Sequence, residues 1–184
     1  MPWFDALKRY LFRRSLQLET TLLNRKGEVR NYANSRFIGI WFDATDRENY
    51  TLINSFSKTL SAKGKKVEVL GFIDKVKKTE TILFDYLEPK EVSWNGVPNE
   101  NAIDIWASKE YDLLLCLHPN PCNPLEYLAM LSQAKCRVGR YSEDTVECYD
   151  IMVSLNEEGE LPSMIKQVDR LLTEINKNQQ QNAA

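Results

Sequence analysis

Two apolar runs separated by one helix-length segment constrain the fold of this chain more than any other feature. Residues 36–42 (RFIGIWF) are continuously apolar after the arginine, which is the pattern of a strand covered on both faces. Residues 65–73 (KKVEVLGFI) form the second run, and apolar residues recur at helical spacing between the two runs. A strand, a crossover helix and a second strand predict a βαβ unit with parallel strands.

Local signals predict where this crossover helix begins and ends. Thr45 is followed three residues later by Glu48, which is the spacing of a capping box, so we expect the helix to start near Asp46. Gly64 is a suitable residue to terminate it.

The segment between residues 74 and 110 is less regular. Residues 81–87 (TILFDYL) are typical of a strand, but the segment before them is too short to hold a crossover helix. This strand therefore either forms a hairpin with the second run or lies at a sheet edge, and its direction stays open. Asn95-Gly96 predicts a turn, and a short helix is expected after Asn99 or Asn101 as its N-cap.

The rest of the chain continues the alternation of strands and helices. Residues 111–141 predict strand, turn, helix and strand, and another strand is expected near residues 149–155. The last helix carries a regular apolar stripe: Leu161, Met164, Ile165, Val168, Leu171, Leu172 and Ile175. We therefore predict an α/β fold, a Rossmann-like or flavodoxin-like mostly parallel sheet with helices on both faces, as a single domain over residues 35–177. Residues 178–184 are expected to form a disordered tail.

Residues 1–27 predict a basic amphipathic helix in front of this domain. The first 36 residues carry eight basic and three acidic side chains, so their net charge is about +5, against about −7 for the remainder. The predicted apolar stripe of the helix comprises Phe4, Leu7, Leu11, Leu18 and Leu22. Arg14 interrupts this stripe, which argues against deep insertion into a membrane.

The turn HPNPCNP, residues 118–124, follows a predicted strand at the position where many folds of this class bind phosphate. Its prolines each remove a backbone N–H donor and it has no glycine, so it is a poor phosphate nest. Asn123 suits an N-cap, Pro124 the first helical position and Glu126 a capping box. The first strand is not followed by G-x-G-x-x-G, and the chain contains no Walker motif. Ordinary dinucleotide or triphosphate binding is therefore not expected, and no cofactor is predicted.

Four polar residues at predicted strand ends form the candidate ligand edge: Asp43, Asp46, His118 and Asn120. Asp74 is placed to join them around a hard cation such as magnesium. Acidic strand ends and helix caps are common in this layout, however, and no metal site is predicted. His118 is the only histidine, and a loop position without an acid–base role is the favoured interpretation.

The cysteines favour structural thiols. Cys116, Cys122, Cys136 and Cys148 do not have standard zinc-ligand spacing, and a chain of this size needs no disulfides, which fits a reducing cytoplasm. Cys122 as a nucleophile near His118 stays an alternative, although no third, orienting group is identified.

Two family resemblances follow from these motifs. The basic leading helix, the FIGIWFD-type first strand and YDLLLCL…NPLEYLAMLSQAKCRVGRY together resemble a small uncharacterised bacterial family of Bacteroidetes type, which has no established activity. Residues 111–141 alone are similar to a segment of the acceptor-binding N-terminal domain of heptosyltransferase-like glycosyltransferases, in which a D-L-x-x-x-L strand leads into an apolar helix and an A-K-x-x-x-G strand.

The second resemblance implies a related half-fold without transferase activity. The Gly-Asp signature of that family after the first strand is replaced by DATD, and the chain has no room for the domain that binds the sugar nucleotide. No catalytic residue is carried over.

These observations lead to two hypotheses on function. The first is a non-catalytic interaction or membrane-peripheral module in the cytoplasm, whose Trp3, Phe4, Lys8, Arg9 and Arg13 face a protein partner or an anionic membrane. The favoured alternative for this helix is packing on its own domain or on a second copy in a homo-oligomer. The second hypothesis is a small-molecule binder or enzyme that uses the candidate ligand edge. Nucleic-acid binding ranks third, because the basic side chains are confined to one terminal segment.

Overall fold

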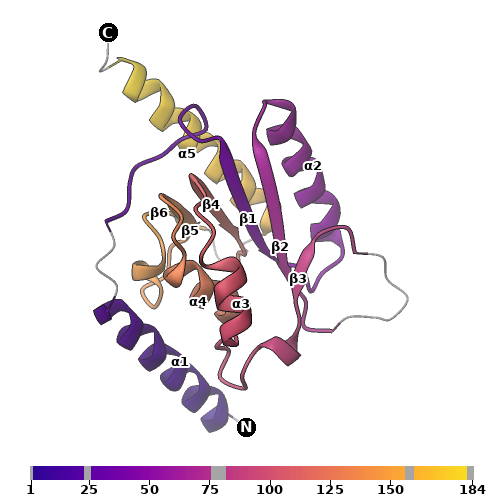
Figure 1. Ribbon diagram of the computed structural model, residues 1–184, viewed down its shortest axis with the longest axis vertical. Coiled ribbons are helices and arrows are strands. Elements are labelled where there is room, and N and C mark those ends of the chain that lie inside the picture. The colour runs from indigo at the N-terminus through magenta and orange to yellow at the C-terminus, as the bar shows by residue number, and fades with distance from the viewer. Residues whose placement is uncertain (1, 23–25, 76–81, 156–159, 182–184) are drawn as a thin grey trace.

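The fold is a six-stranded parallel sheet with helices on both faces (Figure 1). The computed structural model describes residues 2–22, 26–75, 82–155 and 160–181. The strand order is β3-β2-β1-β4-β5-β6, and every neighbouring pair is parallel. The strands are β1 (Phe37–Asp43), β2 (Lys66–Phe72), β3 (Asp85–Leu87), β4 (Leu113–Leu117), β5 (Arg137–Arg140) and β6 (Ile151–Val153). This is the order of a Rossmann sheet, so the predicted fold class is confirmed.

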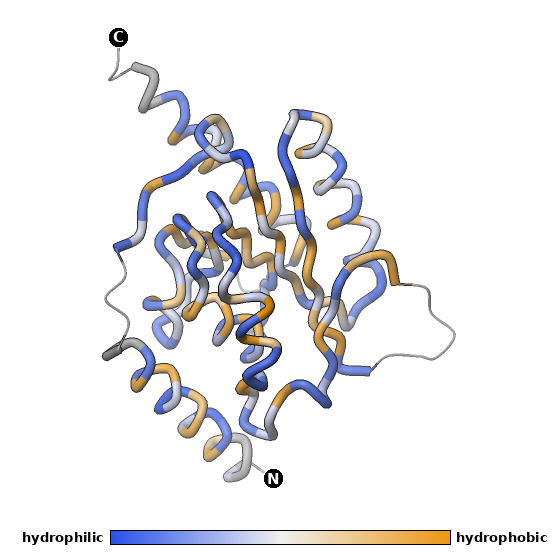
Figure 2. Tube along the Cα trace, in the orientation of Figure 1, coloured by the Kyte–Doolittle hydropathy of each residue, from blue (hydrophilic) through white to orange (hydrophobic). Residues whose placement is uncertain are grey.

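The helices form a layer on each side of this sheet. The α-helices are α1 (Pro2–Leu22), α2 (Glu48–Ala62), α3 (Glu100–Trp106), α4 (Asn123–Leu131) and α5 (Leu161–Gln181), with short 3-10 turns at Pro89–Glu91 and Val146–Cys148. Along β1, Ile38 and Ile40 pack with α2 and α5, whereas Trp41 packs with α3 and α4 on the other face. Apolar residues accordingly follow the strands through the middle of the molecule (Figure 2).

The structure decides the direction of the strand near residue 85. β3 lies at the edge of the sheet and runs parallel to β2, with Asp85 opposite Leu70 and Leu87 opposite Phe72. It therefore does not form a hairpin with β2. Part of the predicted strand and of its connection, residues 76–81, lies outside the described residues.

Three predicted helix boundaries and turns are confirmed. α2 ends at Ala62, and Gly64 follows with a φ of 79°, a left-handed conformation that glycine adopts without steric cost. Asn99 is the N-cap of α3, and its side-chain oxygen accepts a hydrogen bond from the N–H of Ala102 at 2.8 Å. Gly96 completes the predicted turn, and its N–H donates to the Ser93 carbonyl at 2.9 Å.

Two predicted helix N-caps are wrong, although both helices begin within two residues of the expected position. The capping box of Thr45 and Glu48 does not form, because Glu48 is itself the first residue of α2 and Arg47 precedes it without a side-chain cap. Asn123 is the first residue of α4 and not its N-cap, a position that Cys122 occupies.

The final helix confirms its predicted apolar stripe. Leu161, Met164, Val168 and Leu172 are buried against the sheet with β1, β4 and β5 side chains. The helix continues to Gln181, into the stretch for which the sequence predicts a tail.

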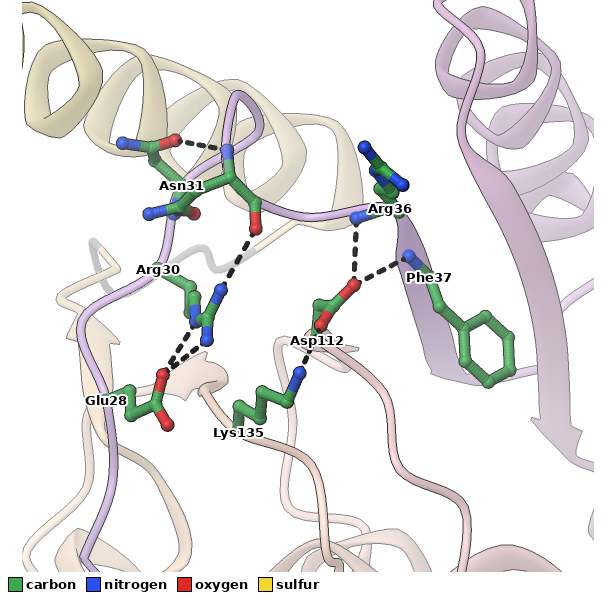
Figure 3. A network of polar contacts seen from close by, with 8 residues as sticks. Glu28, Arg30, Asn31, Arg36, Phe37, Asp112 and Lys135 are labelled. Atoms are coloured by element: carbon green, nitrogen blue, oxygen red, sulfur yellow. Dashed lines mark hydrogen bonds and ion pairs between the residues drawn. The ribbon is translucent and has the colours of Figure 1, made fainter.

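The amino edge of the sheet is held by carboxylates that accept hydrogen bonds from strand N–H groups. Asp112 precedes β4 and accepts from the backbone N–H groups of Arg36 and Phe37 at 2.9 and 3.1 Å (Figure 3). The ammonium of Lys135 donates to its other oxygen at 2.8 Å. Burial would raise the pKa of Asp112, but these hydrogen bonds prevail and lower it to about 2.

Asp150 plays the same part between β5 and β6. It precedes β6 and accepts a hydrogen bond from the N–H of Arg137, the first residue of β5, at 2.7 Å. The guanidinium of Arg137 pairs with the same carboxylate and also donates to the carbonyls of Ala129 and Met130 at 3.1 and 2.9 Å. Because Arg137 is only 6% exposed, these bonds compensate a buried charge. They also provide hydrogen-bond donors to the carbonyls in the last turn of α4.

The segment between α1 and β1 packs along this same edge. The N–H of Glu28 donates to the Lys135 carbonyl at 2.9 Å, and the Lys65 ammonium reaches the Tyr32 carbonyl at 2.5 Å. Gly27 lies so close to Asp150 that a side chain at this position would collide with the carboxylate. Residues 26–35 therefore help to cover the amino ends of the strands.

Candidate functional site

The topological switch point lies between β1 and β4, because the chain proceeds outward from these two strands in opposite directions. In open parallel sheets the crevice at the carboxyl ends of such strands is the usual ligand site. β1 ends at Asp43 and β4 ends at Leu117, so the turn FDATD and the turn HPNPCNP meet here.

The turn after β1 is built by its own carboxylates. Asp43 accepts a hydrogen bond from the N–H of Thr45 at 2.9 Å, and Asp46 accepts one from the N–H of Glu48 at 3.1 Å. The Asn49 amide donates to the Asp43 carbonyl at 3.1 Å and ties the turn to the first turn of α2. These short-range bonds replace the capping box that the Thr45–Glu48 spacing predicts.

His118 lies beneath the proline turn and is only 1% exposed. Its Nδ1 is 3.2 Å from the Asn120 carbonyl oxygen, which can only accept, so Nδ1 carries the ring proton. Its Nε2 is 3.1 Å from the hydroxyl of Tyr149 and therefore accepts a hydrogen bond from that hydroxyl. Burial lowers the pKa of His118, and the ring stays neutral with both nitrogens engaged. This arrangement is that of a histidine that holds a turn in place.

The thiols are similarly unsuited to nucleophilic chemistry. None of the four cysteines forms a disulfide bond, and all four are buried. Burial raises the pKa of Cys116 and of Cys122 well above the ordinary value, and it raises that of Cys148 to about 12. Each of these three groups is therefore protonated near neutral pH, whereas nucleophilic attack requires the thiolate.

Two cavities open at the carboxyl edge, one on each side of the switch point. The first, which we term the edge cavity, measures about 590 Å³ and is lined by Lys8, Arg9, Asp43, Thr45, Phe72, Asp74, Pro89, Val92, Ser93, Trp94, Gly96 and residues 121–124. The other, which we term the α2 cavity, measures about 580 Å³ and is lined by Asp43, Thr45, Asp46, Glu48, Asn49, Leu52, Pro119, Asn120 and residues 160–162.

The structure brings together three of the four residues of the candidate ligand edge. Asp43 lines both cavities, and Asp46 and Asn120 line the α2 cavity. His118 lines neither cavity, because the turn that it supports covers it. Asp74 reaches the edge cavity from the end of β2. Within the described ranges, no group of three His, Cys, Asp or Glu residues is placed to hold a metal ion.

The N-terminal helix packs on the domain, but not with its predicted face. Phe12 and Leu16 are buried, and the Phe12 ring lies 6.3 Å from that of Tyr127 on α4, centroid to centroid. The Tyr127 hydroxyl donates to Glu19 at 3.2 Å, and Arg13 forms an ion pair with Asp144.

Two residues of the predicted apolar stripe point outward instead. Leu7 is 39% exposed and Leu18 is 61% exposed. Trp3 and Tyr10 are 63% and 58% exposed, and Arg14 is exposed as well. These five residues share one side of the helix at helical spacing, and we call them the outward stripe. The side chains of Phe4 and Leu22 lie outside the described residues. No helix in the described part of the chain is both long and apolar enough to cross a bilayer.

The sequence did not indicate two components of the edge cavity. Lys8 and Arg9 come from α1, and their place beside Asp43 depends on how that helix docks on α4. Trp94 comes from the irregular segment before α3, where only the Asn95-Gly96 turn signal marked a structured loop. Neither position follows a spacing rule, so no local pattern places these residues at the sheet edge.

Comparison with known proteins gives a family but no function. A search of curated proteins gives no match, and neither does a search of solved structures. The resemblances to heptosyltransferase-like enzymes and to a Bacteroidetes-type family therefore stay predictions. One family model matches residues 8–175, from the first turns of α1 to the inner stripe of α5, and confirms that the family is uncharacterised. The chain thus belongs to the family of unknown function DUF6913.

Proposed function

We propose that this protein is a non-catalytic cytoplasmic module that docks on an anionic membrane surface through the outward stripe of α1. The supporting observation is that one side of the helix is anchored by Phe12 and Leu16 while the other exposes two aromatic and two aliphatic side chains. A helix held in this way can present the apolar residues of the outward stripe to a membrane without detaching from the domain.

The composition of the outward stripe suits an interface better than the bilayer core. Trp3 and Tyr10 are the residue types that concentrate at the headgroup level of membranes. Arg14 lies among them, and its long side chain can extend to lipid phosphates while its stem stays on the apolar surface. A basic residue near an anionic surface contributes about 1 kcal/mol. The arginine that interrupts the stripe therefore favours shallow binding.

The chemistry of the buried groups supports the non-catalytic part of the proposal. The ring nitrogens of His118 are both engaged, and burial raises the pKa of Cys116, Cys122 and Cys148. The cytoplasmic location is supported by four cysteines without a disulfide bond, the state that a reducing compartment maintains.

Co-sedimentation with vesicles tests the docking. We expect the full chain to sediment with mixed phosphatidylglycerol–phosphatidylcholine vesicles and not with phosphatidylcholine alone. The double variant Trp3→Ser/Tyr10→Ser should lose this binding and keep its melting temperature, because both side chains are exposed. Leu83→Ser is the matched control, since Leu83 is 88% exposed but lies away from α1.

Three results would overturn the docking proposal. They are equal binding to both kinds of vesicle, absence of binding, and a dimer in sedimentation velocity that Trp3→Ser/Tyr10→Ser dissociates. The last result would assign the outward stripe to contact with a second copy of the chain.

A second candidate function is small-molecule binding at the carboxyl edge, which the two cavities beside the switch point favour. A relationship to the acceptor domain of glycosyltransferases would be part of this second candidate function. The strand–turn–helix–strand segment 111–141 supports it. A bacterial origin is likewise part of what we propose.

A further inference from the structure

We infer that the edge cavity binds a small zwitterion, namely an amino acid or a short peptide with free termini. The ammonium group would lie toward Asp43 and Asp74, and the carboxylate toward Lys8 and Arg9. This inference makes the second candidate function specific and is independent of membrane docking.

The charges that line the edge cavity are the first argument. Lys8 and Arg9 enter from α1, whereas Asp43 and Asp74 enter from the ends of β1 and β2. None of these four side chains forms an ion pair with another described residue. Two cations and two carboxylates thus line one open cavity without neutralising each other directly. A ligand with one positive and one negative end satisfies both sets.

The same charges disfavour ligands that carry one kind of charge only. A phosphate group would meet Asp43 and Asp74, and Pro121 and Pro124 remove two of the backbone N–H donors that phosphate sites use. A metal ion would meet the repulsion of Lys8 and Arg9. A zwitterion, by contrast, can form charge-assisted hydrogen bonds with both sets, because its ammonium faces the carboxylates of the cavity and its carboxylate faces the cations.

The remaining walls suit an apolar side chain of such a ligand. Phe72, Val92 and Trp94 line the cavity, and the indole of Trp94 is 55% exposed. A volume of about 590 Å³ lies in the range of ligand sites and leaves room for more than one residue.

The loop that carries Trp94 is held in a defined conformation. The Ser93 hydroxyl donates to the Val97 carbonyl at 2.8 Å and accepts from the Val97 N–H at 3.1 Å. Gly96 has a φ of 93° and lies against Asn123, where a side chain would collide. The loop is therefore seated on the start of α4, so this wall of the edge cavity is formed before any ligand arrives.

Calorimetric titration of the full chain with a matched ligand set tests the inference. The probes are L-phenylalanine and the dipeptide alanyl-phenylalanine, each also as its N-acetyl and its C-terminal amide form. We expect at least one parent zwitterion to bind, and each blocked form of it to bind at least about tenfold more weakly, because each lacks one charged end. Which parent binds more tightly distinguishes a free amino acid from a peptide.

Variants of the cavity assign each ligand end to its wall. Arg9→Gln should weaken the parent about tenfold but leave the amide form unchanged, since that form has no carboxylate. Asp74→Asn should in the same way weaken the parent and leave the N-acetyl form unchanged. Arg14→Gln is the control, because Arg14 belongs to the same helix but lies on the outward stripe.

The possible failures are distinguishable. Absence of binding by all six probes overturns the inference. Binding of the blocked forms as tightly as the parents, with a loss on Trp94→Ala, overturns the zwitterion but keeps small-molecule binding in the edge cavity. Parent binding that Arg9→Gln and Asp74→Asn leave intact places the ligand elsewhere and overturns the site.

Discussion

The two edges of the sheet use their acidic residues differently. At the amino edge, Asp112 and Asp150 accept hydrogen bonds from strand N–H groups and pair with cations. At the carboxyl edge, Asp43 and Asp74 line an open cavity and form no ion pair with a described residue. The strands explain part of this difference. The amino ends of parallel strands leave N–H donors unpaired, so a carboxylate there completes the sheet. The carboxyl ends leave carbonyls, which a carboxylate cannot satisfy. Acidic residues at the amino edge should therefore contribute more to the free energy of unfolding than those at the carboxyl edge, and stability measurements can test this difference.

The largest effect is expected from Arg137, the buried cation of the amino edge. Arg137→Met removes the bonds of the guanidinium to Asp150, Ala129 and Met130 and should lower the free energy of unfolding by about 3 kcal/mol, because the partly buried carboxylate loses its cation. Urea denaturation measures this change. Arg170→Gln on α5, whose ion pair with Glu174 is exposed, should stay within about 0.5 kcal/mol. Similar values for the two variants would contradict the structural role of the amino edge.

A direct comparison of the two edges comes from Asp112→Asn and Asp74→Asn. We expect Asp112→Asn to cost about 1.5 kcal/mol at neutral pH, because the carboxylate loses its charge-assisted bonds. Asp74→Asn should change stability by less than about 0.5 kcal/mol. If Asp74→Asn costs as much as Asp112→Asn, the contrast between the edges fails.

The stabilisation by Asp112 should also depend on pH. The pKa of Asp112 in the folded chain is about 2, below the ordinary value of 3.8. The stabilisation is therefore complete above pH 3.8 and is lost as the pH falls toward 2, since the unfolded chain binds the proton first. Chemical denaturation across this range should bring Asp112→Asn and the unaltered chain together at the acidic end.

The smallest effect concerns His118, which is structural although it lies at the carboxyl edge. Burial lowers its pKa below the ordinary 6.5, so the unfolded chain takes up a proton at a higher pH than the folded chain does. The contribution of His118 to stability should therefore fall as the pH drops below 6.5. His118→Gln, which does not titrate, should remove this slope. An unchanged slope in His118→Gln would show that another group titrates.

Most of the fold could be predicted from local patterns. The continuous apolar sequence of β4 predicts a strand buried on both faces, and all five of its residues are buried. The stripe of α5 and the N-cap Asn99 follow helical spacing and side-chain chemistry in the same way. These features depend on residues within one element, so a local sequence pattern is sufficient to predict them.

The candidate site could be predicted only in part. Asp43, Asp46 and Asn120 reach the two cavities because each follows or neighbours a strand end, which the order of elements already specifies. His118 occupies a similar position along the chain but is buried beneath the proline turn, where Tyr149 from a distant segment hydrogen-bonds to its ring. Sequence spacing does not distinguish these two outcomes.

Local sequence patterns specify most elements of this fold: buried strands, amphipathic helices and polar residues at the carboxyl ends of the strands. Which surfaces of these elements meet depends on their packing in three dimensions. α1 has apolar residues on more than one side, and contact with Tyr127 on α4 selects the side of Phe12 and Leu16. That choice turns Trp3 and Tyr10 outward and brings Lys8 and Arg9 to the edge cavity. The physical reason is that periodicity is a property of one helix, whereas burial depends on the shape and polarity of the partner against which the helix packs.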